Sequence, residues 1–329
     1  MAITGVDIGT NRLVSAILGP EGTPILKSER DAFYRIVPKS EVNKNAIRMS
    51  LEKRGTSFIE EGDNFCVVGE DAIQIALDRN DASMRPMQQG VISPKDKANM
   101  PILKLLLKSL VGAGNSDKLV YSVPGIPIDS SFDIEYHTAL IGMFFKELGY
   151  IPTPINEAFA IGLNELLDSG VTGVSASFGA GMTNIAVMAQ GDPVVTFSTT
   201  RSGDFIDKQV GVALDMSPSL VQIEKEAGVD LTNPKNKIIE AVAVYYKSVI
   251  NYTVSNISYE LKKRKSTLPV FRGSVPVVLS GGLSWAIGFE GMFRDALSSV
   301  ELPFKLGDVK VVEDPNSCVA LGCLLAAQL

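Results

Sequence analysis

Several residue types on which enzyme classes depend are scarce in this chain. Its 329 residues include one histidine, His137, and three cysteines, Cys66, Cys318 and Cys323. A single histidine, in a segment that is expected to be helical, supplies the parts of neither a histidine-based zinc site nor a serine–histidine relay. The cysteines lack metal-ligand spacing, and their odd number argues against a disulfide framework. A reducing, cytoplasmic location is therefore expected.

An excess of positive charge is also missing, because the net charge is −6. The chain thus has no electrostatic reason to bind nucleic acid or an anionic bilayer directly. No secretion signal or amphipathic helix precedes the first predicted strand, so no direct membrane anchor is expected. The uncharged stretch 169–191 contains five glycines and several hydroxyls, which favours a buried hairpin over a membrane span.

What is present fits a folded α/β protein. The composition, 45% hydrophobic and 21% charged, is ordinary for a globular chain, and the length allows two core-forming units. Residues 236–263 have apolar positions at mainly helical spacing and predict a long helix or helix pair. Ser93 and Pro94 resemble a helix start, and Pro101 is expected to kink or split the helix that follows.

Two similar glycine-bearing turns lie about half the chain apart. Residues 3–18 form an apolar run, a turn and a second alternating run, which predicts a hairpin. In that turn Gly9 permits close approach of a phosphate, Thr10 offers a hydroxyl and N–H groups, and Asp7 can hold Mg²⁺ through water. Residues 174–188 repeat the plan, with Ser177 in the place of Asp7. One such turn alone would be an ordinary hairpin turn, but the pair indicates a phosphate site.

A third glycine-rich element follows a predicted strand late in the chain. The strand runs into Ser280, Gly281 and Gly282, after which a helix is expected. Glycines at this position would let a flat base or a ribose approach the backbone.

The order of these three elements resembles the actin superfamily, in which they are the phosphate-one, phosphate-two and adenosine motifs. Residues 156–162 and 314–322 resemble the two connecting helices of that family. Further likeness to prokaryotic actins of the MreB and MamK type lies in 86–92, 123–125 and 203–207. The resemblance spans nearly the whole chain. It implies an actin-like ATPase fold with two similar large subdomains, small inserted subdomains and a nucleotide cleft.

On this plan the first half comprises residues 1–150, with a small insertion at 33–70 and completion by the C-terminal 311–329. The second half comprises residues 151–310, with 209–264 inserted as a helical subdomain. The pairing of similar motifs indicates an ancient duplication.

The resemblance also implies residue roles. Glu157 matches the residue that orients the attacking water, Asp7 would hold the metal, and Glu226 matches the acid that contacts the ribose. Trp285, the only tryptophan, either packs in the core or contacts the adenine. The residues expected to bind the nucleotide are Asp7, Gly9, Thr10, Asn11, Ser177, Gly179, Ala180, Gly181, Met182, Thr183, Gly203, Asp204, Glu226, Gly281, Gly282, Leu283 and Trp285.

The chain departs from the family in its second turn. Ser177 replaces the usual aspartate, Met182 the usual threonine, and Asn184 the usual acid. A hydroxyl can bind a metal-bound water but brings no charge, so the grip on magnesium and the activation of water should weaken. Backbone N–H groups would still hold the phosphates. We therefore expect ATP and ADP to bind with Mg²⁺, and hydrolysis to be slow or altered.

The sequence is compatible with three functions. The first is a cytoskeletal protein that binds ATP and polymerises with itself, with an unknown adaptor. The second is a small-metabolite kinase of the same superfamily, for which Asp129 and Asp133 are the candidate bases, although surface caps explain these two residues better. The third is a scaffold that holds nucleotide without hydrolysing it.

Overall fold

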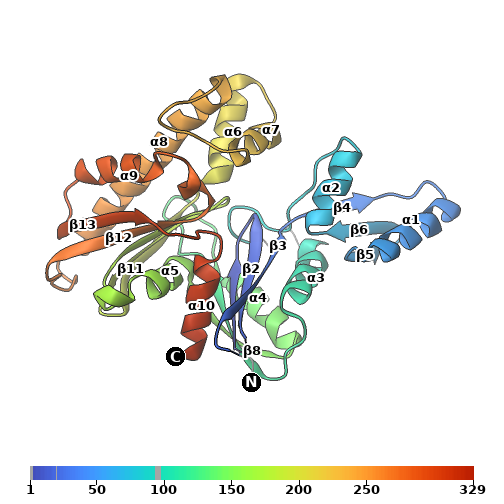
Figure 1. Cartoon of the computed structure of the whole chain (residues 1–329), viewed down its shortest axis with the longest axis horizontal. Helices are drawn as coiled ribbons and strands as arrows, with labels where there is room; N and C mark the ends of the chain where they lie inside the picture. The colour runs from blue at the N-terminus through green and yellow to red at the C-terminus, as the bar shows by residue number, and fades with distance from the viewer. Residues whose placement is uncertain (1–2, 20, 93–97) are drawn as a thin grey trace.

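The computed structural model describes residues 3–19, 21–92 and 98–329. The helix start predicted at Ser93 and Pro94 lies outside these ranges. The described chain forms two large α/β halves, each carrying a smaller lobe (Figure 1). None of the helices within the described ranges is both long and apolar enough to cross a membrane.

The first half is built on a five-stranded sheet with the order β3-β2-β1-β7-β8. Its strands are β1 (Ile3–Ile8), β2 (Arg12–Leu18), β3 (Pro24–Arg30), β7 (Asp117–Val123) and β8 (Tyr150–Asn156). The predicted hairpin at 3–18 is confirmed, because β1 and β2 pair antiparallel. Both faces of this sheet are covered, and neighbouring side chains on β2 divide between them: Leu13 packs toward α3 (Met100–Val111) and α4 (Glu135–Glu147), whereas Val14 packs against α10 (Cys318–Gln328).

The second half repeats this sheet with the order β11-β10-β9-β12-β13. Its strands are β9 (Gly173–Phe178), β10 (Thr183–Ala189), β11 (Asp192–Thr199), β12 (Ser274–Ser280) and β13 (Lys305–Val311). The central strand is β1 in the first sheet and β9 in the second. On one side it continues into two antiparallel strands, and on the other side it is followed by two parallel strands. The stretch 169–191 is the β9–β10 hairpin, as predicted.

Two helices fill the space between the sheets. Helix α5 (Glu157–Glu165) begins after Asn156, whose side chain accepts a hydrogen bond from the Phe159 N–H. It crosses α10 so closely that a Cβ on Gly322 would lie 1.9 Å from the carbonyl oxygen of Ala160. Their shared core joins the two halves.

Each half carries a smaller lobe (Figure 1). In the first, β4 (Phe33–Ile36), β5 (Phe58–Glu61) and β6 (Asn64–Val68) form a sheet with the order β4-β6-β5, beside α1 (Glu41–Arg54) and α2 (Glu70–Asp78). In the second, α6 (Gly203–Leu214), α7 (Pro218–Glu226) and α8 (Lys237–Lys263) pack together. The long helix predicted at 236–263 is thus one continuous helix, capped by Asn236.

The kink or split predicted at Pro101 applies to a helix that starts at Ser93, outside the described ranges, so it stays a prediction. Helix α3 begins at Met100, so Pro101 lies in its first turn, where a missing N–H costs no intrahelical hydrogen bond. Elsewhere in the described ranges the chain forms α9 (Phe289–Ser298) and the 3₁₀ turns η2 (Leu167–Ser169) and η3 (Gly282–Trp285).

Candidate nucleotide site

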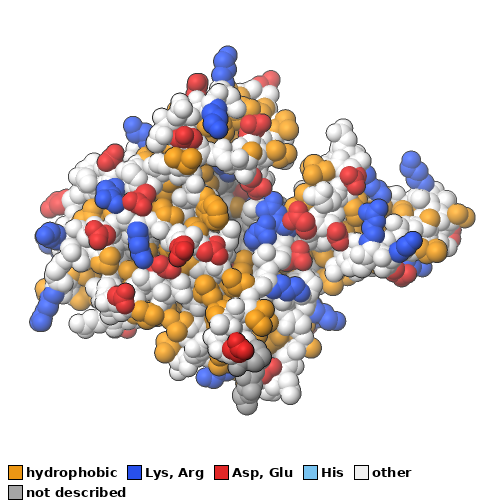
Figure 2. All heavy atoms as spheres, viewed as in Figure 1, with side chains coloured by type: hydrophobic (Ala, Val, Ile, Leu, Met, Phe, Trp, Pro, Cys, Tyr) orange, Lys and Arg blue, Asp and Glu red, His pale blue; other side chains and the backbone are white. Residues whose placement is uncertain are grey.

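A cavity of about 500 Å³ lies where the ends of both central hairpins face each other. Residues of the first half, the second half and both connecting helices line it. The space-filling view shows a hollow between the lobe of α6 and α7 and the lobe of α2, with charges of both signs gathered in it (Figure 2). Of the residues predicted to bind nucleotide, all line this cavity except Thr183.

The first turn, between β1 and β2, holds Asp7 at the end of its strand. The Ser122 hydroxyl donates to Oδ1 of Asp7 at 2.9 Å and accepts from the N–H of Ile8 at 2.8 Å. A Cβ on Gly9 would lie 2.4 Å from the carbonyl oxygen of Arg12, so only glycine closes this turn without strain.

The second turn, between β9 and β10, places Ser177 where the first places Asp7. Asp7 pairs with Val14 across the first hairpin, and Ser177 pairs with Asn184 across the second, at the same step of the register. The two turns also meet: a Cβ on Gly181 would lie 2.5 Å from the Thr10 hydroxyl.

Thr183 differs from the expectation for this turn. Its side chain is fully buried, and its hydroxyl donates to the carbonyl oxygen of Arg201 at 3.0 Å. The register explains this position, since Thr183 pairs with Phe178 inside the sheet. Thr183 therefore braces the turn and does not face the cavity.

Two carboxyl groups face the phosphate end of the cavity. Glu157 begins α5, and its Oε2 accepts a hydrogen bond from the Asn184 amide at 2.8 Å. Burial, and then the negative charge of Asp7, raise the pKa of Glu157 to about 8, against a hydrogen bond from Ser177. Burial also raises the pKa of Asp7 to about 6, against the hydrogen bond from Ser122. A cation bound beside these two carboxyl groups would offset the cost of burying their charges and would favour their ionised forms.

A magnesium ion brought by a nucleotide fits this donor set. Within the described ranges, no three side chains of His, Cys, Asp or Glu gather closely enough to hold a metal by themselves. Mg²⁺ usually binds through one or two carboxylates, its own waters and the phosphates of a bound nucleotide. Asp7 matches that need as the one carboxylate, and Ser177 adds only a hydroxyl.

The other end of the cavity is lined by the third glycine element. Gly281 has φ +87°, and a Cβ there would lie 2.5 Å from the carbonyl oxygen of Phe178. Trp285 lies in η3 and is 60% exposed while lining the cavity, so it is not packed in the core. A flat group can approach this wall.

The sequence reasoning missed several lining residues, among them Arg12, Arg30, Asp207, Gln222 and Lys225. Lys225 and Asp207 form a buried ion pair at 2.7 Å. Each lies next to a predicted site residue on its helix: Lys225 directly precedes Glu226, and Asp207 follows Asp204 by three positions. That proximity is the signal from which the sequence could have predicted them. Arg30 lies at the end of β3 and carries no local signal.

Neither candidate kinase base lines the cavity. Both oxygens of Asp129 accept from the Thr200 N–H, at 2.9 and 3.1 Å, and Asp133 accepts from the N–H of Glu135 at 2.8 Å. Other potential catalysts are also buried away from the cavity: His137 accepts from the N–H of Ile92, and all three cysteines are free and buried.

Comparisons with known proteins agree with this architecture. A solved structure described as a MamK double helical filament matches with a TM-score of 0.74 and 21% identity, over 100% of this chain and 99% of that one. MreB5 of Spiroplasma citri bound to AMPPNP matches with 0.67 and 16%, over 98% and 94%. The ethanolamine utilization protein EutJ of Carboxydothermus hydrogenoformans matches with 0.56 and 17%, over 99% and 90%. No curated protein sequence matches significantly.

Two sheets of the same strand order, joined by two central helices beside one cavity, define the fold that the chain shares with these actin-like structures. The structural matches share the fold across nearly the entire chain. Residues 1–327 match the model of the Volactin family, and the chain belongs to that family.

Proposed function

We propose that this chain is a cytoskeletal actin-like protein that binds ATP or ADP with Mg²⁺ between its two halves, divided near residue 150, and polymerises with itself. The observation that carries the proposal is the meeting of both glycine turns, Asp7 and Glu157 at one end of a single cavity. Backbone N–H groups of the turns would hold the phosphates, and Asp7 would hold waters of the metal.

In this proposal Glu157 orients the attacking water and accepts its proton. Phosphoryl transfer to water depends mainly on positioning and on neutralising the phosphate oxygens. Because Ser177 brings no charge, the metal is held from one side only, and hydrolysis is slow. The bound nucleotide would bias closure of the halves and thereby the contacts between subunits.

Self-assembly is supported by the fold that the chain shares with the MamK filament. The kinase alternative has no supporting observation, because Asp129 and Asp133 are occupied by backbone N–H groups away from the cavity. A scaffold that never hydrolyses its nucleotide is distinguished by the experiment below.

The test combines ATP-dependent pelleting, phosphate release and Trp285 fluorescence on the same samples. Trp285 is the only tryptophan and lines the cavity, so its emission should change when nucleotide binds. Polymer with slow phosphate release supports the proposal, and polymer with no release at all identifies the scaffold. If ATP produces neither polymer nor a fluorescence change, the proposal is wrong.

A further inference from the structure

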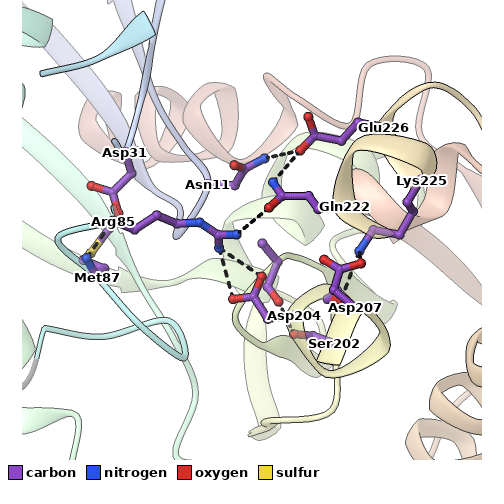
Figure 3. A network of polar contacts seen from close by, with 12 residues as sticks. Asn11, Asp31, Arg85, Met87, Ser202, Asp204, Asp207, Gln222, Lys225 and Glu226 are labelled. Atoms are coloured by element: carbon purple, nitrogen blue, oxygen red, sulfur yellow. Dashed lines mark hydrogen bonds and ion pairs between the residues drawn. The ribbon is translucent and has the colours of Figure 1, made fainter. Parts of the chain in front are cut away.

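Five carboxyl groups line the cavity, and their partners divide them into two kinds. They belong to Asp7, Glu157, Asp204, Asp207 and Glu226. The last three form ion pairs at 2.9, 2.7 and 3.2 Å, and Figure 3 shows two of these, Arg85 with Asp204 and Lys225 with Asp207. A cation of the chain thus already balances each of the three. Within the described ranges Asp7 and Glu157 have no such cation, and their partners are hydroxyl and amide groups.

Ser122 is the hydroxyl partner of Asp7. Its Oγ donates to Oδ1 of Asp7 at 2.9 Å and accepts from the N–H of Ile8 at 2.8 Å. A hydroxyl has a single hydrogen, so its donation to Asp7 leaves none for another acceptor. Ser122 is 1% exposed. The contact therefore belongs to the interior of the sheet and does not depend on solvent.

This contact determines which oxygen of Asp7 faces the cavity. Oδ1 lies on the side of Ser122, whereas Oδ2 lies on the side of Gly9, where a Cβ would be 3.8 Å from it. Gly9 lines the cavity and Ser122 does not. The carboxyl torsion of an aspartate has broad preferences, so a free carboxyl adopts several orientations. The Ser122 hydroxyl selects the orientation in which Oδ2 lies beside the glycine turn.

The sheet register brings Ser122 to this position. Ser122 lies on β7, which pairs parallel with β1 so that Tyr121 stands beside Val6. The next step along both strands brings Ser122 beside Asp7. Both strands lie inside the five-stranded sheet. A side chain on such a strand is held more precisely than one on a loop.

The second sheet has a serine at the equivalent step but no acid for it to hold. Ser280 of β12 stands beside Ser177 of β9, as Ser122 stands beside Asp7. The Ser280 hydroxyl donates instead to the carbonyl oxygen of Pro315, at 3.4 Å. Of the two turns, the one that contains the aspartate is thus the one whose neighbouring serine holds an acid.

We propose that Ser122 is a positioning residue for the metal ion of the nucleotide: it holds the Asp7 carboxylate so that Oδ2 accepts hydrogen bonds from the waters of Mg²⁺. The proposal rests on the proposed function, because it takes the ligand of the cavity to be a magnesium nucleotide. Ser177 brings no charge, so no second acid of the turns supports Asp7 in this role. Partners that orient a metal-binding side chain typically contribute about 10- to 100-fold to metal affinity or activity.

The first test compares ATP binding in Mg²⁺ and in EDTA by the fluorescence of Trp285. Ser122→Ala should weaken the affinity for ATP about tenfold in Mg²⁺ and leave Kd in EDTA within about twofold. The Mg²⁺ concentration that gives half-maximal phosphate release should rise by a similar factor. A variant whose fold is merely damaged would lose affinity in both conditions alike.

Two substitutions at the same position separate the hydrogen bond from packing. Ser122→Thr keeps the hydroxyl and should need no more Mg²⁺ than wild type. Ser122→Cys keeps the shape but has a weak donor, so it should behave like Ser122→Ala. The matched control is Ser15→Ala, because Ser15 is a fully buried serine on β2 whose hydroxyl donates to the carbonyl oxygen of Leu110, away from the cavity. It should leave the Mg²⁺ dependence unchanged.

Equal losses of affinity in Mg²⁺ and in EDTA would overturn the proposal, because Ser122 would then act on the fold of the site and not on the metal. A Ser122→Ala variant with the Kd of wild type in both conditions would overturn it as well. If wild type binds ATP in neither condition, the proposed function is wrong, and the second test decides the role of Ser122 by itself.

The second test needs no nucleotide and compares crystal structures of nucleotide-free wild type and Ser122→Ala. In wild type the Asp7 carboxyl should have one conformer, with Oδ1 on Ser122 and Oδ2 beside Gly9. In Ser122→Ala it should rotate or occupy more than one conformer. The same single conformer in both structures contradicts the proposal even if Mg²⁺·ATP binds. A rotated carboxyl in a chain that binds no ATP contradicts only the proposed function.

Discussion

Asn184 donates its side-chain amide to Oε2 of Glu157 at 2.8 Å, while its Oδ1 accepts from the Gly125 N–H at the same distance. Asn184 lies on β10 of the second half, where it pairs with Ser177 of β9, and Glu157 begins α5. The Asn184 amide therefore holds the Glu157 carboxyl beside the second turn. The backbone bond to Gly125 fixes which end of the amide faces Glu157. Asn184 is thus a positioning residue for the proposed base.

Replacing Asn184→Ala should reduce the rate of phosphate release by roughly 10- to 100-fold, because a base that is free to rotate orients water poorly. The affinity for ATP, measured by Trp285 fluorescence, should change little. The buried Gly125 N–H would also lose its acceptor, at a cost of about 1–3 kcal/mol of stability.

The control for this experiment is Asn164→Ala. Asn164 donates to Oε1 of Glu165 at 2.9 Å on the same helix but does not line the cavity. If both variants release phosphate at the same rate, Asn184 has no role in orienting Glu157.

The stability of the nucleotide-free protein should depend on pH through Glu157. Its pKa is raised from the ordinary 4.5 to about 8, chiefly by burial. Between these values the folded state binds more protons than the unfolded state, so stability is fullest below about pH 4.5 and falls as pH rises toward 8. Urea unfolding should show a loss of up to roughly 5 kcal/mol from Glu157 across this window.

In Glu157→Gln the part of the pH dependence of stability that comes from Glu157 should disappear, because the amide does not ionise. Glu21→Gln, on an exposed turn, serves as the control for the loss of one negative charge. Parallel curves for wild type and Glu157→Gln would show that Glu157 is not held in a desolvated site. The experiment is done without Mg²⁺ and nucleotide, since a bound cation favours the ionised carboxylate.

Restoring an acid at the second turn tests the interpretation of Ser177. Ser177 stands opposite Asn184 as Asp7 stands opposite Val14, so Ser177→Asp places a carboxylate at the corresponding step of the second hairpin. The variant should bind Mg²⁺·ATP more tightly and release phosphate about tenfold faster. Ser175→Asp is not a suitable control because Ser175 is fully buried. Ser177→Thr, which keeps the hydroxyl, should behave like wild type.

Phosphate release that does not rise in Ser177→Asp would mean that the missing acid is not what slows hydrolysis. The nucleotide-free form of this variant should also be less stable, because a third carboxyl joins Asp7 and Glu157 in a buried site. Adding Mg²⁺ with ATP should recover that stability, as binding to the folded state alone does.

Features set by short stretches of sequence could be predicted. The hairpin at 3–18 follows from alternating apolar residues around one turn, and the long helix at 237–263 follows from its periodicity after the cap Asn236. The same signals placed Asp7 and Ser177 at equivalent strand ends. The position of Pro101 in the first turn of α3 did not follow from the sequence, because a proline in a helical pattern is compatible with both a kink and a first turn, and only the helix boundary decides between them.

The contact between Arg85 and Asp204, which lie in opposite lobes, could not be predicted in this way. Arg85 and Asp204 are far apart in the sequence, and each is an ordinary charged residue in its own segment. Their contact depends on how the two lobes face each other, which no local pattern encodes. Asn184 was noticed only as a departure from the family, because its partner Glu157 comes from a different element.

The crossing of the two connecting helices gives the last prediction. Gly322 of α10 packs on α5 so that a Cβ would lie 1.9 Å from the carbonyl oxygen of Ala160 and 2.5 Å from its carbonyl carbon. The obstacle is helix backbone, which cannot rotate aside as a side chain can. Gly322→Ala must therefore separate the helices, and we expect a loss of about 1–3 kcal/mol in the free energy of unfolding.

Gly291→Ala is the matched control, because Gly291 lies on α9 and a Cβ there would meet nothing within 4 Å. Alanine within a helix should stabilise that variant by roughly 0.5–1 kcal/mol. The two glycine-to-alanine changes should thus have opposite signs in urea unfolding. If Gly322→Ala is as stable as wild type, the helices do not cross at this distance, and the shared core between the two halves is looser than the structure indicates.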